Sequence, residues 1–188
     1  MRVTSAVLGP LGTNAYLIEI GERTVLVDPA DDSAALHALV GHRTIDWIVN
    51  THGHYDHVGG DWAIPSGGIC IHERDVPFVT RFFPNHPPFD RYLRDGDEVV
   101  PGLRVMHTPG HSPGSVALVA GGALFAGDLL FAGSIGRTDL PGGSDEDMER
   151  SLRRVLALAG TVTVYPGHGP KTTLEREKNS NPFLEGLV

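Results

Sequence analysis

Three histidines and one aspartate lie close together in the run His52-Gly53-His54-Tyr55-Asp56-His57. The run directly follows an apolar stretch, Asp46–Asn50, which we predict to be a short buried strand. A loop that leaves a strand can direct such side chains at one point, and imidazole and carboxylate groups are ligands of zinc and other divalent metals. The chain must therefore fold with this loop at the edge of a sheet. A surface loop that contains histidines by chance is the alternative, and four potential ligands so close together disfavour it.

Four residues cannot complete two open metal sites, so donors from other parts of the chain are needed. Three further candidates each follow a predicted strand and stand beside a glycine. Strand ends at a sheet edge would hold such donors rigidly. The candidates and the strands before them are His111 after Leu103–His107, Asp128 after Ala123–Ala126 and His168 after Thr161–Tyr165.

Composition limits the classes to which this protein can belong. The chain has 188 residues, 40% of them hydrophobic and 20% charged, so it can bury a large core, and we expect one domain over residues 1–188. A net charge of −8 disfavours a nucleic-acid partner, and no run approaches the roughly 20 apolar residues of a membrane span. Cys70 is the only cysteine, and its apolar neighbours indicate a buried thiol. We therefore expect a cytoplasmic protein with neither a nucleic-acid nor a membrane partner.

The remaining sequence predicts short strands mixed with a few helices, without a strict alternation of the two. This pattern favours sheets covered by helices, with functional loops at one edge. Val76–Phe89 combines prolines with aromatic residues and predicts an irregular helix and loop, whose aromatic side chains either pack on the core, which we favour, or line a substrate entrance. The other predicted elements are a hairpin of Asn14–Ile20 and Thr24–Asp28, strands Gly68–Ile71 and Ser115–Val119, and helices Ser33–Val40, Asp145–Ala159 and one capped by Thr172.

The candidate ligands resemble, in order and context, the metal-ligand set of the metallo-β-lactamase fold superfamily, and the resemblance extends from Asn14 to about Leu184. It implies an α/β (α+β) fold, a four-layer αββα sandwich. It also implies that Asp28 holds a ligand imidazole in orientation. Two divalent metal ions are implied, and we expect zinc, although the same donors accept iron or manganese. In the implied arrangement, His52, His54 and His111 bind one metal, Asp56, His57 and His168 bind the other, and Asp128 bridges them.

Two stretches, Gly127–Asp139 and Tyr165–Pro170, resemble the glyoxalase II group, the hydroxyacylglutathione hydrolases, and most of all their short bacterial relatives. The resemblance implies a dinuclear enzyme that hydrolyses a small-molecule acyl thioester, such as S-lactoylglutathione, through a metal-bound hydroxide. Asp56 would orient the nucleophile or take its proton, and Arg137 would bind a substrate carboxylate. Asp139 stands where the family has a tyrosine, and the C-terminal helical domain that holds glutathione is not expected here. We therefore expect weaker or broader thiol recognition.

Two other functions stay open at this point. Persulfide dioxygenases share the fold and a similar Gly-Arg-Thr-Asp stretch but use one iron, which His52, His111 and Asp128 would bind. A metal-binding module without activity is the other alternative, and seven ligands without a cysteine resemble an open catalytic site more than a closed structural one. The sequence leaves the thiol, the acyl group and the oligomeric state open.

Overall fold

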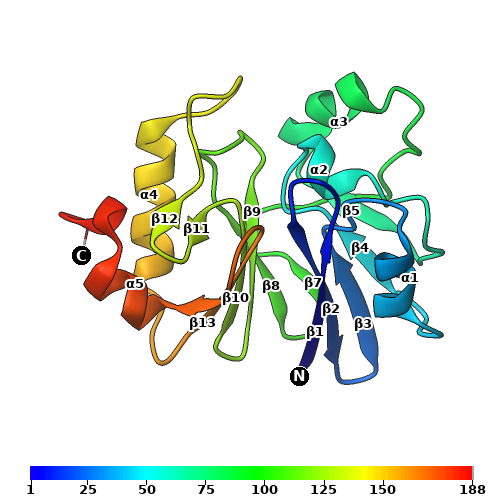
Figure 1. Ribbon diagram of the computed structural model, residues 1–188, viewed down its shortest axis with the longest axis horizontal. Helices are drawn as coiled ribbons and strands as arrows, with labels where there is room; N and C mark the ends of the chain where they lie inside the picture. The colour runs from blue at the N-terminus through cyan, green and yellow to red at the C-terminus, as the bar shows by residue number, and fades with distance from the viewer. Residues whose placement is uncertain (188) are drawn as a thin grey trace.

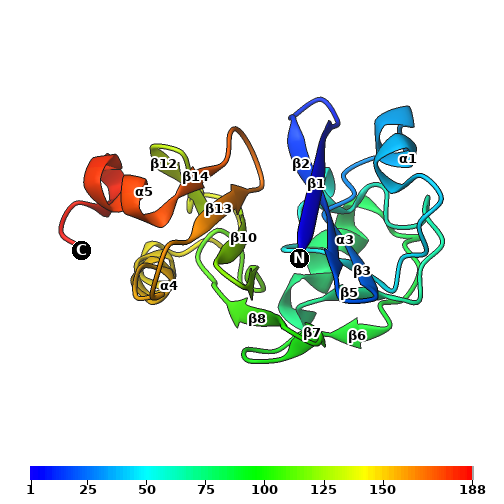
Figure 2. The same cartoon turned by 90° about the horizontal axis from the view of Figure 1, so that it is seen from below.

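Two six-stranded sheets pack face to face in the computed structural model, which describes residues 1–187. Helices α4 (Asp145–Leu156) and α5 (Leu174–Ser180) lie on the outer side of one sheet, and α1 (Ala34–Val40) and α3 (Val76–Phe82) lie on the outer side of the other (Figure 1). The view from below shows the same order of layers, helix, sheet, sheet and helix (Figure 2). This arrangement confirms the predicted αββα sandwich.

The N-terminal sheet has the strand order β1-β2-β3-β4-β5-β6. The first three strands are antiparallel, and the pairs from β3 to β6 are parallel. The predicted hairpin is confirmed as β2 and β3, whereas the polar edge strand β1 lacks a clear alternation and was not predicted. The bounds are β1 (Arg2–Leu8), β2 (Thr13–Ile20), β3 (Arg23–Val27), β4 (Trp47–Val49), β5 (Ile69–Ile71) and β6 (Arg91–Tyr92).

The C-terminal sheet has the strand order β14-β13-β10-β9-β8-β7, and only its β10–β13 pair is parallel. Strands β11 (Leu130–Phe131) and β12 (Ser134–Ile135) form a separate hairpin beside it. The sheet strands are β7 (Glu98–Val100), β8 (Leu103–His107), β9 (Val116–Ala120), β10 (Ala123–Gly127), β13 (Thr163–Pro166) and β14 (Thr172–Thr173).

The largest buried cluster lies between the sheets, because alternate residues of each strand point inward from both sides. Phe125 at its centre is fully buried, stacks on Tyr165 with ring centroids 4.9 Å apart and meets Tyr16 edge-on at 5.5 Å. Leu124, the preceding residue, points the other way and packs in the cluster under α4. Cys70 lies in the inter-sheet core as predicted, and burial raises the pKa of its thiol to about 12.

The ends of two helices differ from the prediction. Helix α4 begins at the predicted cap, where Ser144 accepts a hydrogen bond from the Asp147 N–H, but it ends at Leu156 and not at Ala159. Helix α5 is capped by Thr173, not by Thr172, because Thr172 belongs to β14 and donates its hydroxyl to the buried Glu177. Within residues 1–187, no helix is long and apolar enough to cross a membrane.

Hydrogen bonds join the two sheets at the edge that carries the candidate ligands. The Tyr16 hydroxyl donates to the Pro166 carbonyl at 2.6 Å, and the Asn14 side chain donates to the same carbonyl at 3.0 Å and to that of Gly169 at 2.8 Å. On the other side, the Val116 N–H donates to the Thr51 carbonyl at 2.8 Å. Loops from both sheets are therefore held against each other at this edge.

Candidate metal centre

The structure brings all seven candidate ligands together where four strands end. His52 and His54 follow β4, and Asp56 and His57 lie on the short helix α2 (Tyr55–Val58). The other three follow strands of the opposite sheet. Three groups of donors have ligand atoms within 4.8 Å of one another: His52, His54 and His111; His52, His57 and Asp128; and Asp56, His57 and His168.

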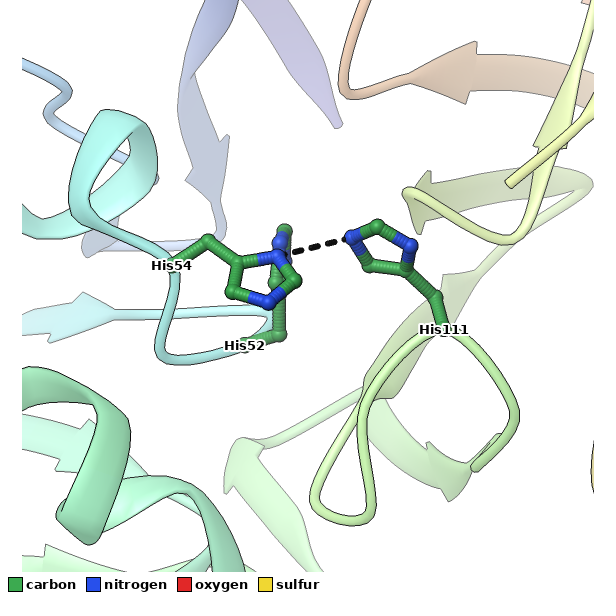
Figure 3. Close-up of side chains that lie close together, drawn as sticks. All are labelled: His52, His54 and His111. Carbon is green, nitrogen blue, oxygen red and sulfur yellow. Dashed lines mark hydrogen bonds between the residues drawn. The ribbon is translucent and has the colours of Figure 1, made fainter. Parts of the chain in front are cut away.

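The first group takes imidazoles from both sheets. Figure 3 shows His52 and His54 approaching from one loop and His111 from the loop between β8 and β9. The His54 Nδ1 and His111 Nε2 atoms are 2.9 Å apart, and the His52 ring stands edge-on to both other rings. His52 and His111 are buried and His54 is half-buried. The three rings therefore present nitrogen atoms to one small space.

The second group combines two imidazoles with a carboxylate. The His168 Nε2 atom lies 3.3 Å from Asp56 Oδ2 and 3.4 Å from the Nε2 atom of His57. His57 is fully buried, whereas His168 and Asp56 border open space. This group thus resembles the first in having one deeply buried imidazole.

Asp128 lies between the two groups. Its Oδ1 atom is 3.5 Å from His57 Nε2, and its Oδ2 atom is 3.5 Å from His111 Nε2 and from His168 Nε2. Its carboxylate therefore faces imidazoles of both groups.

The charge states of these residues follow from burial and from their neighbours. Burial, reinforced by the imidazole of His111, lowers the pKa of His54 to about 4, and burial holds that of His52 well below 6.5. Burial alone would lower the pKa of His57 as well, but the carboxylates of Asp28 and Asp128 raise it to about 9. Metal binding needs imidazoles without a proton on the ligand nitrogen, which is the state of His52 and His54 at neutral pH.

Two buried atoms of the cluster lack a hydrogen-bond partner among residues 1–187, namely His52 Nε2 and Asp128 Oδ1. Buried polar atoms are almost always satisfied, so such a pair calls for a ligand. Imidazole nitrogen and carboxylate oxygen without thiolate form a donor set that suits a divalent cation in an open site. The residues present therefore fit divalent metal ions.

Asp28 contacts His57 from behind, as the sequence predicts. Its Oδ2 atom lies 2.9 Å from His57 Nδ1 and accepts the Thr51 hydroxyl at 2.7 Å, while Oδ1 accepts the Thr51 N–H at 2.7 Å. Asp28 is the one non-glycine residue with positive φ in the described part of the chain, at 51°. Residues in this conformation cluster at functional sites, where the surrounding contacts maintain them. His111 is oriented in the same manner, with Nδ1 2.8 Å from the Arg137 carbonyl.

A cavity of about 460 Å³ opens beside the cluster. Phe78 and Phe82 of α3 line it, whereas Val79 points into the core, so the expectation that the aromatics of Val76–Phe89 pack inward is wrong for these two. Arg137 also lines it, but its guanidinium already pairs with both Asp139 oxygens at 2.7 Å. Further lining residues that the sequence analysis missed, because no local pattern marks them, are Leu11, Tyr55, Arg81, Leu140 and Pro141.

A four-layer sandwich with a His/Asp cluster at its sheet edge defines a metallo-hydrolase type of protein. The family described as the metallo-beta-lactamase superfamily matches residues 8–168, and the chain belongs to it. The probable metallo-hydrolase YqgX of Bacillus subtilis (strain 168) is 31% identical to it, with 96% of each chain covered.

Solved structures of full-length similarity differ in what their names state. TTHA1623 in a di-iron-bound form is 41% identical, with a TM-score of 0.85 and coverage of 96% of this chain and 100% of the other. The BLEG-1 B3 metallo-beta-lactamase is 34% identical, with a TM-score of 0.84 over 97% and 99% of the chains. ETHE1 from Myxococcus xanthus is 28% identical, with a TM-score of 0.81 over 99% and 85%. These neighbours establish the superfamily without singling out a glyoxalase II subtype.

Asp28→Asn is expected to weaken metal binding by about 10- to 100-fold, because an amide places an N–H₂ group against a donor of Thr51 or His57. Competition with a chromophoric chelator measures this change. Asp32→Asn is the control, since Asp32 is exposed and pairs only with the surface residue His37. Equal affinities of both variants and the unchanged protein would contradict the role of Asp28.

Proposed function

We propose that this protein hydrolyses acyl thioesters at a dinuclear metal centre. The observation that carries the proposal is the pair of three-residue donor groups with the Asp128 carboxylate between them, at the wall of a cavity. His52, His54 and His111 would hold one metal, Asp56, His57 and His168 the other, and Asp128 would contact both. The name of YqgX as a probable metallo-hydrolase and the di-iron form of TTHA1623 support this proposal.

Zinc is the first metal candidate, and the di-iron form of a similar protein makes iron the second. Divalent metals at such a centre lower the pKa of water and stabilise negative charge on an acyl oxygen. Asp56 borders the cavity as a carboxylate, so it accepts a hydrogen bond from the attacking water and orients it. The buried His52 and His57 form the closed side of the cluster, which leaves approach from the cavity.

The cavity walls favour a substrate with an apolar part and a negative charge. Phe78, Phe82 and Leu140 supply apolar surface, and Arg81 and Arg137 supply the cations. Arg137 would have to leave Asp139 to bind a carboxylate, whereas Arg81 pairs with no carboxylate among residues 1–187 and lies 5.9 Å from the Phe82 ring centroid. We therefore propose Arg81 as the first contact of a substrate carboxylate and Arg137 as the second.

The metal-loaded protein is expected to hydrolyse S-lactoylglutathione, and Asp56→Asn or His54→Ala should lower the rate at least about 100-fold, because each removes a group at the reacting atoms. Release of the free thiol gives the rate. His37→Ala is the matched control, since this histidine lies on the exposed face of α1.

A persulfide dioxygenase is the second candidate, and the similarity to ETHE1 supports it without favouring it over hydrolysis. In that case a single iron would be held by His52, His111 and Asp128. Oxygen uptake with glutathione persulfide and one iron per chain, without thioester hydrolysis, would overturn the hydrolase proposal.

Asp128→Ala is expected to lower metal occupancy in both groups, because the carboxylate faces imidazoles of each. Elemental analysis of the purified protein gives the number of metals per chain. Loss of one metal with full retention of the other would contradict the bridging position.

Arg81→Gln is expected to lower kcat/KM for a glutathione thioester about 10-fold, since a charged hydrogen bond contributes about 1.5–3 kcal/mol. The rate with an uncharged N-acetylcysteamine thioester should stay unchanged, because it has no carboxylate for the guanidinium. Arg104→Gln, on the exposed side of β8, is the control. An equal loss with both substrates would show that Arg81 does not recognise the carboxylate.

A further inference from the structure

We infer that Asp75 is a positioning residue that ties together the two loops carrying the first donor group. Asp75 is fully buried and ends the short helix η1 (Glu73–Asp75), directly before α3. Its carboxylate accepts three hydrogen bonds, from the Gly53 N–H at 2.8 Å, the Ser112 hydroxyl at 2.6 Å and the Gly114 N–H at 2.6 Å. The role assigned to Asp75 rests on the proposed dinuclear function.

The first of these hydrogen bonds fixes the backbone between two candidate ligands. Gly53 stands between His52 and His54, and its N–H points at Asp75 Oδ2. A Cβ atom on Gly53 would lie 2.4 Å from the Asp75 carbonyl oxygen, so the loop passes too close to Asp75 for any side chain. The direction in which both imidazoles leave the loop therefore depends on this contact.

The other two hydrogen bonds fix the turn that carries His111. Ser112 follows His111 directly, and its hydroxyl also lies 2.6 Å from that of Ser115. A Cβ atom on Gly114 would lie 2.6 Å from Asp75 Oδ1, which shows that this turn rests on the carboxylate as tightly as the first loop does. One side chain thus spans the gap between a loop of the N-terminal sheet and a loop of the C-terminal sheet.

A carboxylate is the group that these three donors require. No Lys or Arg within residues 1–187 forms an ion pair with Asp75, so its buried charge is balanced by hydrogen bonds alone. An amide in its place can accept at only one atom and would turn an N–H₂ group toward a donor. A bond to at least one of the two loops would then be lost.

The contacts of Asp75 reach only one donor group. Its partners adjoin His52, His54 and His111, whereas His57 is oriented by Asp28 and His168 follows β13. The structure therefore separates the supports of the two groups. Loss of Asp75 should weaken the metal held by the three imidazoles and spare the other.

Chelator competition on the metal-loaded full chain tests this selectivity. In Asp75→Asn, one of two metals should bind at least about 10-fold more weakly while the other keeps its affinity. Asp61→Asn is the matched control, because Asp61 is an equally buried carboxylate that accepts from Asn50 at 2.8 Å and contacts His86 at 2.9 Å. It should lose thermal stability but keep both metals. Unchanged affinities in Asp75→Asn, equal weakening of both metals, or the same selective loss in Asp61→Asn would overturn the assignment.

Hydrogen exchange of the metal-free protein gives a second readout that does not depend on the number of metals. The amides of Gly53 and Gly114 should exchange faster in Asp75→Asn than in Asp61→Asn, and unchanged exchange would overturn the role of Asp75. An unsubstituted protein that binds a single metal would contradict the dinuclear proposal alone. If Asp75→Asn does not fold, Ser112→Ala removes one donor and should show a smaller change of the same kind at Gly114; no change there would overturn the assignment.

Discussion

The packing of two sheets on one apolar layer determines where every candidate ligand lies. Because β4, β8, β10 and β13 pack around Phe125 and its neighbours, their ends reach the same edge of the sandwich. Residues distant in sequence, such as His54 and His168, thereby border one cavity. The sandwich acts as a rigid frame, and the chemistry belongs to the loops that leave it.

A cluster of buried imidazoles and carboxylates is costly for a folded chain, because each group gives up water. The opposite effects on His54, whose pKa falls, and His57, whose pKa rises, show that the cluster has no uniform charge state of its own. Divalent cations would satisfy both kinds of donor at once and add to the stability of the fold. Stability and function therefore make the same demand on these residues.

The sequence predicted the ligands better than their surroundings. His52, Asp128 and the others stand in short glycine-flanked motifs, so local spacing and a family resemblance were enough to find them. Arg81 and Asp75 belong to an irregular segment, and only the tertiary fold brings them to the cavity wall and to the ligand loops. Similarly, the end of α4 depends on packing that periodicity does not encode. A single domain over residues 1–188, a cytoplasmic location and the absence of nucleic-acid or membrane partners stay predictions.

Three buried aspartates together hold the loop around His52, although each comes from a different part of the chain. A glycine-containing loop outside regular structure has backbone donors that need acceptors, and a carboxylate can satisfy several of them. The same negative charges favour divalent cations nearby, so the supports of the loop also attract what it would bind. This explains why the loop keeps its shape without side-chain packing of its own. The pairs are Asp61 with Asn50, Asp28 with Thr51, and Asp75 with Gly53.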